Sequence, residues 1–409
     1  MPSTNPIDGY TIASTIDAEQ VSMQLTRASD FRRAFVPSWH TGRLLLVAAM
    51  AALPAGCATH ERADAISGDL QTSVKALAHK HRVCNVTIAV IKNRKLDTIV
   101  SGTGCVAAVA AHADSVYQAA SLSKPLFAYG VMQLVAQGKL ALDAPVLSYL
   151  PQGYRHQFNS LQHGPSEFVS DQRMQAITVR MVLNHTSGLP NWASGPLYFE
   201  APPGKQFNYS GEGYVLLQRA VEAVTGQTLD EFMAAQVFKP LDMQNSDFKW
   251  TERIGAQLSP GSKANGAPRA AMLMTDPVAA FSLYTTAADY GKFLVAVLND
   301  APALKRLTTA PVTVDADLGL SWGLGWGMER HRDDAFIWHW GNNTGYRAFV
   351  LASVRSGEGF VMLTNSENGL ALAPPLAQKI LPGEHKLFDS ALLGFDVTNF
   401  ICNTMRLCF

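Results

Sequence analysis

The sequence lacks the patterns that usually hold a metal ion or bind a nucleic acid. It has no C-x-x-C, no H-E-x-x-H and no carboxylates at ligand spacing, so we expect neither a metal site nor another cofactor. Its 33 basic and 33 acidic residues cancel, and no basic stripe indicates a nucleic-acid partner. Charged residues make up only 16% of the 409 residues and hydrophobic residues 47%, which excludes a disordered chain and allows a large buried core.

Residues 1–57 are predicted to be an export signal and not part of the fold. A basic stretch from Arg32 to Arg43 precedes an apolar run, 44–54, which is too short to span a bilayer. Two small residues then lead to Cys57, an arrangement that resembles a bacterial lipoprotein box in which the cysteine is lipidated. That box usually has leucine three residues before the cysteine, and this chain has Pro54 there.

Three other interpretations of this leader stay open. A plain cleaved signal would make Cys57 a coincidence, and a cytosolic protein with an unusual tail would have no signal at all. The pair Arg32-Arg33 resembles a twin-arginine signal, and Met23 is an alternative start. We expect the bacterial cell envelope, periplasm or outer membrane, with a lipid anchor at Cys57.

Four further cysteines lie beyond this leader. Cys84 and Cys105 flank two strand-like runs joined by a polar turn, 92–95, and a hairpin there would bring the two thiols within disulfide reach. Such a bond suits an oxidising compartment. Two buried free thiols are the alternative. Cys402 and Cys408 are weaker candidates for a small C-terminal loop.

Strand-like runs gather toward both ends of the chain, and the middle is mainly helical. The expected strands are 85–91, 96–101, 114–119, 325–330, 334–340, 346–354 and 360–365. We therefore predict an α+β fold in which 62–138 and 284–381 build one antiparallel sheet flanked by helices, with 139–283 as an inserted helical domain. The polar stretches 152–175 and 254–270 are expected to be surface loops. Residues 382–409 form an unassigned tail.

The segment Ser121-Leu122-Ser123-Lys124 carries the clearest chemical signal. A serine and a lysine three residues apart share one face of a helix. An amine kept neutral in a dry place can take the proton that a nucleophilic serine must lose. The apolar run 122–137 predicts a helix buried on every side, so Ser121 stands at a helix N-terminus, where developing negative charge is favoured. A plain helix N-cap is the alternative role for this serine.

Three later segments strengthen this signal by their order. They are 177–190, which contains His185-Thr186-Ser187-Gly188-Leu189-Pro190; 203–214, which contains Tyr209-Ser210-Gly211; and Trp338-His339-Trp340-Gly341. Together with 285–289 and 323–326, this set resembles the class C β-lactamase family. That family includes D-alanyl-D-alanine carboxypeptidases, and esterases and amidases of β-lactamase fold. The resemblance covers about residues 68 to 365 and implies a β-lactamase/transpeptidase-like fold.

The resemblance implies a role for three side chains. Ser121 corresponds to the acylated nucleophile, and Lys124 to its proton acceptor or to the group that tunes it. Tyr209 corresponds to the phenol that moves protons to and from Ser121 and the leaving group. A lysine ammonium beside this phenol is expected to lower its pKa.

The resemblance also places the third motif on an edge strand. His339 is expected to contact the substrate, with a satisfied strand histidine as the alternative. Past Gly341, the backbone N–H of Asn342 should form the oxyanion hole together with that of Ser121. His185 is expected to be a structural turn residue.

Two departures from the family bear on the substrate. The family's Tyr-x-Asn ends in Gly211 here, and His339-Trp340 replaces the Lys-Thr of true β-lactamases. Both argue against efficient β-lactam hydrolysis. We expect an acyl-enzyme hydrolase of small esters, amides or D-amino-acid peptides, with esterase or amidase ranked first, D-peptidase second and β-lactamase third. The alternative is a catalytically weak penicillin-binding or cell-wall-peptide sensing domain.

Overall fold

An eight-stranded antiparallel sheet lies at the centre of the computed structural model, which describes residues 70–105, 109–160, 164–331 and 334–393. The predicted export signal with Cys57, and the pair Cys402 and Cys408, lie outside the described residues. Within the described residues, no helix is both long and apolar enough to cross a membrane.

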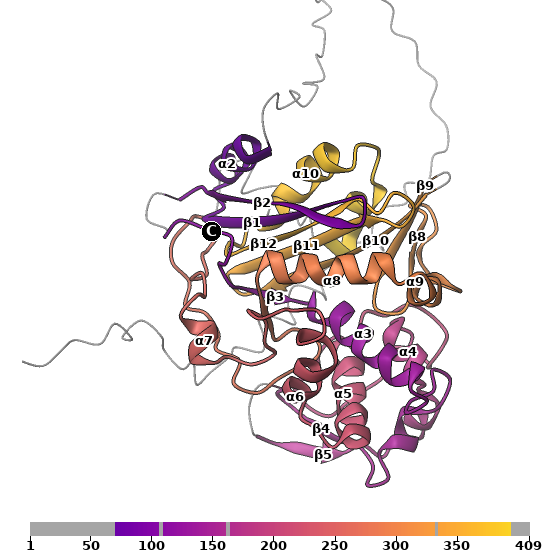
Figure 1. Cartoon of the computed structure of the whole chain (residues 1–409). Helices are drawn as coiled ribbons and strands as arrows, with labels where there is room; N and C mark the ends of the chain where they lie inside the picture. Colours follow the sequence, from indigo (N-terminus) through magenta and orange to yellow (C-terminus); the bar gives the residue numbers. More distant parts are fainter. Residues whose placement is uncertain (1–69, 106–108, 161–163, 332–333, 394–409) are drawn as a thin grey trace, which may run out of the picture. The chain divides into compact units, whose positions relative to one another are not determined.

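The sheet combines strands from both ends of the described chain, as the sequence predicted (Figure 1). Its order is β2-β1-β12-β11-β10-β9-β8-β7. The strands are β1 (Asn85–Lys92), β2 (Lys95–Thr103), β7 (Val312–Asp315), β8 (Leu320–Trp322), β9 (Gly327–His331), β10 (Asp334–Asn343), β11 (Tyr346–Ser353) and β12 (Gly359–Thr364). The α+β class and the antiparallel sheet are confirmed. Sequence patterning missed β7 and β8, which are too short to show an alternation.

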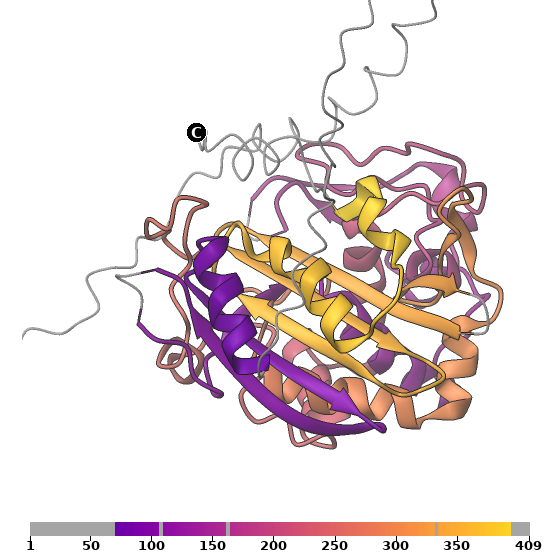
Figure 2. The ribbon, with the colours of Figure 1, turned by 90° about the horizontal axis from the view of Figure 1, so that it is seen from above.

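Helices cover both faces of the sheet. Helices α2 (Leu70–Lys80) and α10 (Ala373–Ile380) lie across one face, and Figure 2 views the sheet through them. Helices α8 (Ala287–Asn299) and α3 (Ser123–Ala136) lie on the other side (Figure 1). Strand β1 contributes side chains to the cores on both faces of the sheet, because successive side chains of a strand point to opposite faces. Ile88 packs toward α2 and α10, whereas its neighbour Ala89 joins the core around α3 and α8.

The stretch between α3 and α8 contains further helices, one short hairpin and one strand that pairs with a strand before α3. The helices are α4 (Val179–Leu183), α5 (Gly211–Thr225), α6 (Leu229–Met233) and α7 (Glu252–Gly255); α9 (Ala301–Thr308) follows α8. Strand β3 (Tyr117–Ala120) pairs with β6 (Leu283–Thr285), and β4 (Arg155–Gln157) pairs with β5 (Ser166–Phe168).

The prediction that 152–175 is a surface loop is wrong in part. It contains the β4–β5 hairpin, and His156 at its centre is fully buried. The imidazole lies 3.2 Å from the buried carboxylate of Glu212 on α5, measured from Nε2 to Oε2. A polar segment thus turns inward because its histidine has a buried partner, which composition alone does not reveal.

The structure contains the disulfide predicted at the first hairpin. Cys84 and Cys105 are bonded across the β1–β2 hairpin, with their Cα atoms 4.5 Å apart. The two cysteines are 21 residues apart in the sequence. A disulfide that closes a loop of this size stabilises the folded state by about 3 kcal/mol. It therefore fastens the start of β1 to the end of β2, beside the sheet edge.

Candidate active site

Ser121 stands on a tight turn between β3 and α3. The residue before it, Ala120, has a φ of 50°, in the left-handed region that an alanine rarely adopts. Helix α3 has Leu122 as its N-cap, so Ser121 lies outside the helix and its side chain is not the cap. Its hydroxyl is partly exposed, whereas the following three residues are buried.

Ser123 holds this turn in place from below. Its buried hydroxyl donates to the carbonyl of Ala120 at 2.6 Å and accepts from the backbone N–H of Leu283 at 3.0 Å. The second bond joins the turn to β6, 160 residues further along the chain. Ser123 therefore stabilises the strained residue that presents Ser121.

Lys124 brings a buried amine to the serine. Its Nζ lies 3.1 Å from the Oγ of Ser121 and 2.9 Å from the carbonyl oxygen of Ala280. Burial lowers the pKa of the Lys124 ammonium from 10.5 to about 7. A neutral amine keeps a lone pair, so near neutral pH Lys124 can accept the proton of the Ser121 hydroxyl.

Tyr209 completes the cluster from the loop before α5. Its ring centroid lies 4.7 Å from Lys124 Nζ. Burial raises the pKa of the phenol, and the Ser121 hydroxyl offsets only part of the rise. The expectation that Lys124 lowers this pKa is therefore wrong, because desolvation of the buried phenol outweighs the effect of an amine that is itself only about half charged near pH 7. The phenol is thus protonated at neutral pH and is suited to donate a proton.

His185 supports Tyr209. The histidine is buried, has a φ of 59°, and accepts the backbone N–H of Ser210 at its Nδ1, 3.0 Å away. Its ring stacks obliquely on the Tyr209 ring, with centroids 4.3 Å apart. Burial lowers the pKa of His185 well below 6.5, so the imidazole is neutral. These contacts fit the structural turn residue expected from the sequence.

His339 lies deeper than the sequence suggested. It is on β10 and fully buried, with Nδ1 2.8 Å from the carbonyl oxygen of Trp340. Burial, followed by the nearby charge of Lys124, lowers its pKa to about 3. The substrate contact expected for His339 stays a prediction. Its ring lies 6.2 Å from the Tyr209 ring, measured between centroids.

Gly341 allows β10 to run against β3. The ladder between β10 and β9 ends at Trp338, so the last residues of β10 have only β11 beside them in the sheet. A Cβ atom at Gly341 would stand 2.3 Å from the carbonyl oxygen of Ala119, which no side chain tolerates. Asn342 follows and is exposed. The structure thus brings the strand with Asn342 alongside the strand that leads to Ser121.

Asn343 is a site residue that the sequence did not single out. Its buried amide donates to the side-chain oxygen of Gln118 on β3 at 3.0 Å and to the carbonyl of Phe281 at 3.4 Å. These bonds join three segments that lie far apart in the chain. Only the position next to the third motif could have pointed to it.

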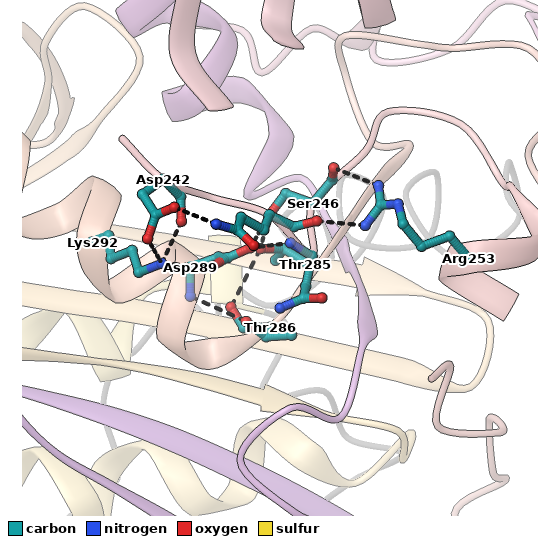
Figure 3. A network of polar contacts seen from close by, with 9 residues as sticks. Asp242, Ser246, Arg253, Thr285, Thr286, Asp289 and Lys292 are labelled. Atoms are coloured by element: carbon teal, nitrogen blue, oxygen red, sulfur yellow. Dashed lines mark hydrogen bonds and ion pairs between the residues drawn. The ribbon is translucent and has the colours of Figure 1, made fainter. Parts of the chain in front are cut away.

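The Thr285–Asp289 motif has a structural role in this chain. Figure 3 shows the buried carboxylate of Asp289 among polar side chains of the β6–α8 junction. It accepts from the Ser246 hydroxyl at 3.0 Å and lies 3.4 Å from Lys292 Nζ, while its own N–H donates to Thr286. The motif therefore fixes the start of α8 directly after the strand that holds Ser123.

Comparisons with known proteins show the family and the fold of this chain. Residues 70–383 match the family model described as Beta-lactamase. Penicillin-binding protein 4 of Amycolatopsis lactamdurans is 26% identical over 354 residues, which cover 76% of this chain and 88% of that protein. Esterase EstB of Burkholderia gladioli is 30% identical over 167 residues, which cover 33% of this chain and 39% of the esterase. The solved β-lactamase/D-alanine carboxypeptidase from Pseudomonas syringae has the same fold, with a TM-score of 0.63 at 18% identity over 76% of this chain and 97% of that one.

Proposed function

The chain belongs to the β-lactamase family of serine hydrolases, and from this premise we propose that it is an esterase or amidase that forms an acyl-enzyme on Ser121. The observation that carries the proposal is the 3.1 Å contact between Ser121 Oγ and Lys124 Nζ. Because the pKa of this amine is lowered to about 7, it can act as a base at neutral pH.

The proposed reaction needs only these groups and water. The Ser121 oxygen bonds to the carbonyl carbon of the ester while its proton passes to Lys124. Backbone N–H groups of Ser121 and Asn342 stabilise the oxyanion. The bond to the leaving oxygen then breaks, and that oxygen takes the Tyr209 proton, which the Lys124 ammonium replaces. In the second half, the Lys124 amine takes the Tyr209 proton while the Tyr209 oxygen takes one from water. The water oxygen bonds to the acyl carbon, the bond from that carbon to Ser121 Oγ breaks, and Ser121 regains its proton from the Lys124 ammonium as the acid leaves.

Two features support esters and simple amides over β-lactams. His339 is buried and neutral, so it offers no positive charge to the carboxylate of a β-lactam. Gly211 has no side-chain amide that could bind an acylamino group. The similarity to an esterase over part of the chain points the same way.

A substrate panel tests the proposal. We expect purified protein to hydrolyse p-nitrophenyl acetate or butyrate with the highest kcat/KM, followed by D-amino-acid amides, and a chromogenic cephalosporin slowest. The ranking is measured as kcat/KM for each substrate at one pH. A cephalosporin that is turned over fastest would contradict it.

The pH profile gives a second prediction. The lowered pKa of Lys124 means that the free amine forms above about pH 7 instead of above 10.5. We therefore expect kcat/KM for p-nitrophenyl acetate to rise with pH through about 7 and to level off by about pH 8.5. The measurement is a series from pH 5 to 9 at constant ionic strength. An activity that keeps rising tenfold per pH unit up to pH 9 would show that Lys124 is still charged there.

A sensing role is the second candidate, and Gly211 is the observation that favours it. A site without the family's amide at this position could acylate and then fail to deacylate. A penicillin adduct on Ser121 that persists for hours, with no turnover of any substrate in the panel, would support the sensor over the enzyme.

We also propose that the chain works in the bacterial envelope, anchored by lipid at Cys57. The disulfide between Cys84 and Cys105 supports an oxidising compartment. Radiolabelled palmitate incorporation in expressing cells, compared with Cys57→Ser, tests the anchor, and equal labelling of the two chains would exclude it.

A further inference from the structure

The indole of Trp192 lies directly against the backbone of Gly211. A Cβ atom at Gly211 would stand 2.7 Å from both Cη2 and Cζ2 of the indole and 2.7 Å from the carbonyl oxygen of Asn191. The ring therefore occupies the space that any larger side chain at this position would need. Gly211 lies two residues after Tyr209, so the indole packs against the segment that carries this phenol.

The backbone on both sides of Trp192 is held to the start of α5. The carbonyl of Asn191 accepts the N–H groups of Gly211 at 3.1 Å and Glu212 at 3.2 Å. The N–H of Ala193 donates to the Glu212 carboxylate at 3.0 Å. Because both neighbours are fixed, the backbone that carries the indole is held against the start of α5.

A buried pair of side chains braces this attachment. Glu212 is 1% exposed and lies 3.2 Å from His156, which is also buried. A carboxylate is costly to bury without partners. Here one oxygen of Glu212 accepts the Ala193 N–H, and the other lies in ion-pair distance of the His156 imidazole. The inward turn of β4 thus serves to hold the loop that presents Trp192.

The indole contacts the opposite side of the site as well. Its ring packs edge-to-face on Phe281, with centroids 5.2 Å apart and planes at 87°. Phe281 follows Ala280, whose carbonyl accepts Lys124 Nζ, and its own carbonyl accepts from Asn343. Trp192 therefore closes the space between the helix next to Tyr209 and the segment that holds Lys124. Both aromatic rings are partly exposed.

We propose that Trp192 limits the length of the acyl group, so that esters of short-chain carboxylic acids are the substrates. This inference rests on the proposed function. The leaving oxygen is directed to the Tyr209 hydroxyl, whose ring packs on Trp340 at 5.0 Å. Trp192 packs on Gly211 and Phe281 and not on Trp340. If the leaving group lies near Tyr209 and Trp340, the acyl group is the part of the substrate that contacts the indole.

The limit on acyl length follows from the packing of the Trp192 indole between Gly211 and Phe281. A long acyl chain must displace an indole that packs on Gly211 at one edge and on Phe281 at another, whereas an acetyl group need not. Differences of one or a few methylenes in such a pocket commonly change kcat/KM by 10- to 200-fold. A shorter side chain at 192 should therefore open the site to longer acids.

The test compares Trp192→Ala with Trp250→Ala as a matched control. Trp250 is also partly buried against the same core but packs on Gly255 of α7. For each protein we compare kcat/KM for p-nitrophenyl octanoate with that for p-nitrophenyl acetate. The octanoate-to-acetate ratio is expected to rise at least about tenfold in Trp192→Ala and to stay within about twofold of the wild type in Trp250→Ala. A second series varies the alcohol and keeps the acetyl group.

Each outcome decides between the claims. An unchanged acyl ratio with Ser121-dependent turnover overturns the inference and leaves the proposed function standing. A shift confined to the alcohol series also overturns it, because Trp192 would then face the leaving group. If no ester is hydrolysed and a fluorophosphonate does not label Ser121, the proposed function fails and the inference with it.

Discussion

Replacing Ser121 by alanine is expected to lower kcat/KM for the best ester by at least about 1,000-fold, because no covalent acyl-enzyme can form. The oxyanion donors are backbone groups and remain, so a small residual rate is expected. The serine hydroxyl is partly exposed and bonds to Lys124, so its loss should change Tm by no more than about 2 °C. The measurement combines ester kinetics with thermal unfolding of the same preparation.

Ser123→Ala is the matched control for this substitution. Its hydroxyl is buried and joins Ala120 to Leu283, so its removal leaves two buried backbone groups without a partner. We expect it to cost about 1–3 kcal/mol of stability and to reduce activity less than Ser121→Ala does. A Ser121→Ala protein that keeps a tenth or more of the wild-type activity would remove Ser121 as the nucleophile.

Lys124→Met is expected to inactivate the protein and at the same time to stabilise it. The loss of the base should lower kcat by about 100- to 10,000-fold. Methionine has a similar length and carries no group that must be desolvated, whereas a buried amine is unfavourable in the folded state. One carbonyl, that of Ala280, loses its donor, which offsets a small part of the gain.

The pH dependence of this stabilisation has a definite sign. The pKa of Lys124 is about 7 in the folded state and 10.5 as its ordinary value, so the unfolded chain binds more protons between these two values. This side chain therefore makes wild-type stability rise with pH in that window. The destabilisation that it causes reaches its full value of about 5 kcal/mol below pH 7. The advantage of Lys124→Met should shrink by about 3 kcal/mol from pH 6 to pH 9.

Denaturant unfolding at the two pH values measures this difference. Lys139→Met is the control, because Lys139 is exposed just beyond the end of α3. It is expected to change neither the activity nor the pH dependence of unfolding. A Lys124→Met protein that is less stable than the wild type at pH 6 would contradict the lowered pKa of the buried amine.

Much of the candidate site could be predicted because its central pair is local in sequence. Ser121 and Lys124 are three residues apart at the start of α3, and their spacing alone predicts that the amine lies near the hydroxyl. The assignment of Tyr209 and the third motif to the site rested only on a family resemblance, because no local pattern in the chain predicts that they lie near Ser121. The sheet strands were visible for the same local reason, as most of them are long enough to show buried, β-branched runs.

The remaining features depend on contacts between distant segments. The Ser123 hydroxyl is bonded to the backbone of Leu283, and the Asn343 amide to the side chain of Gln118, 225 residues away. Neither role can be predicted without knowing the distant partner. The depth of His339 follows from what packs on β10, and a strand pattern does not reveal it. Likewise, Gly211 appears in the sequence only as a missing amide, whereas the structure shows Trp192 in its place.

Peptide mapping by mass spectrometry after brief reaction with a fluorophosphonate tests the nucleophile most directly. We expect one phosphonyl group on the peptide that contains Ser121, formed faster at pH 8 than at pH 6 because the amine with a pKa of about 7 is then free. The label should be absent from Ser121→Ala. A label on another residue, or none on a correctly folded protein, would contradict the catalytic assignment of Ser121 and Lys124.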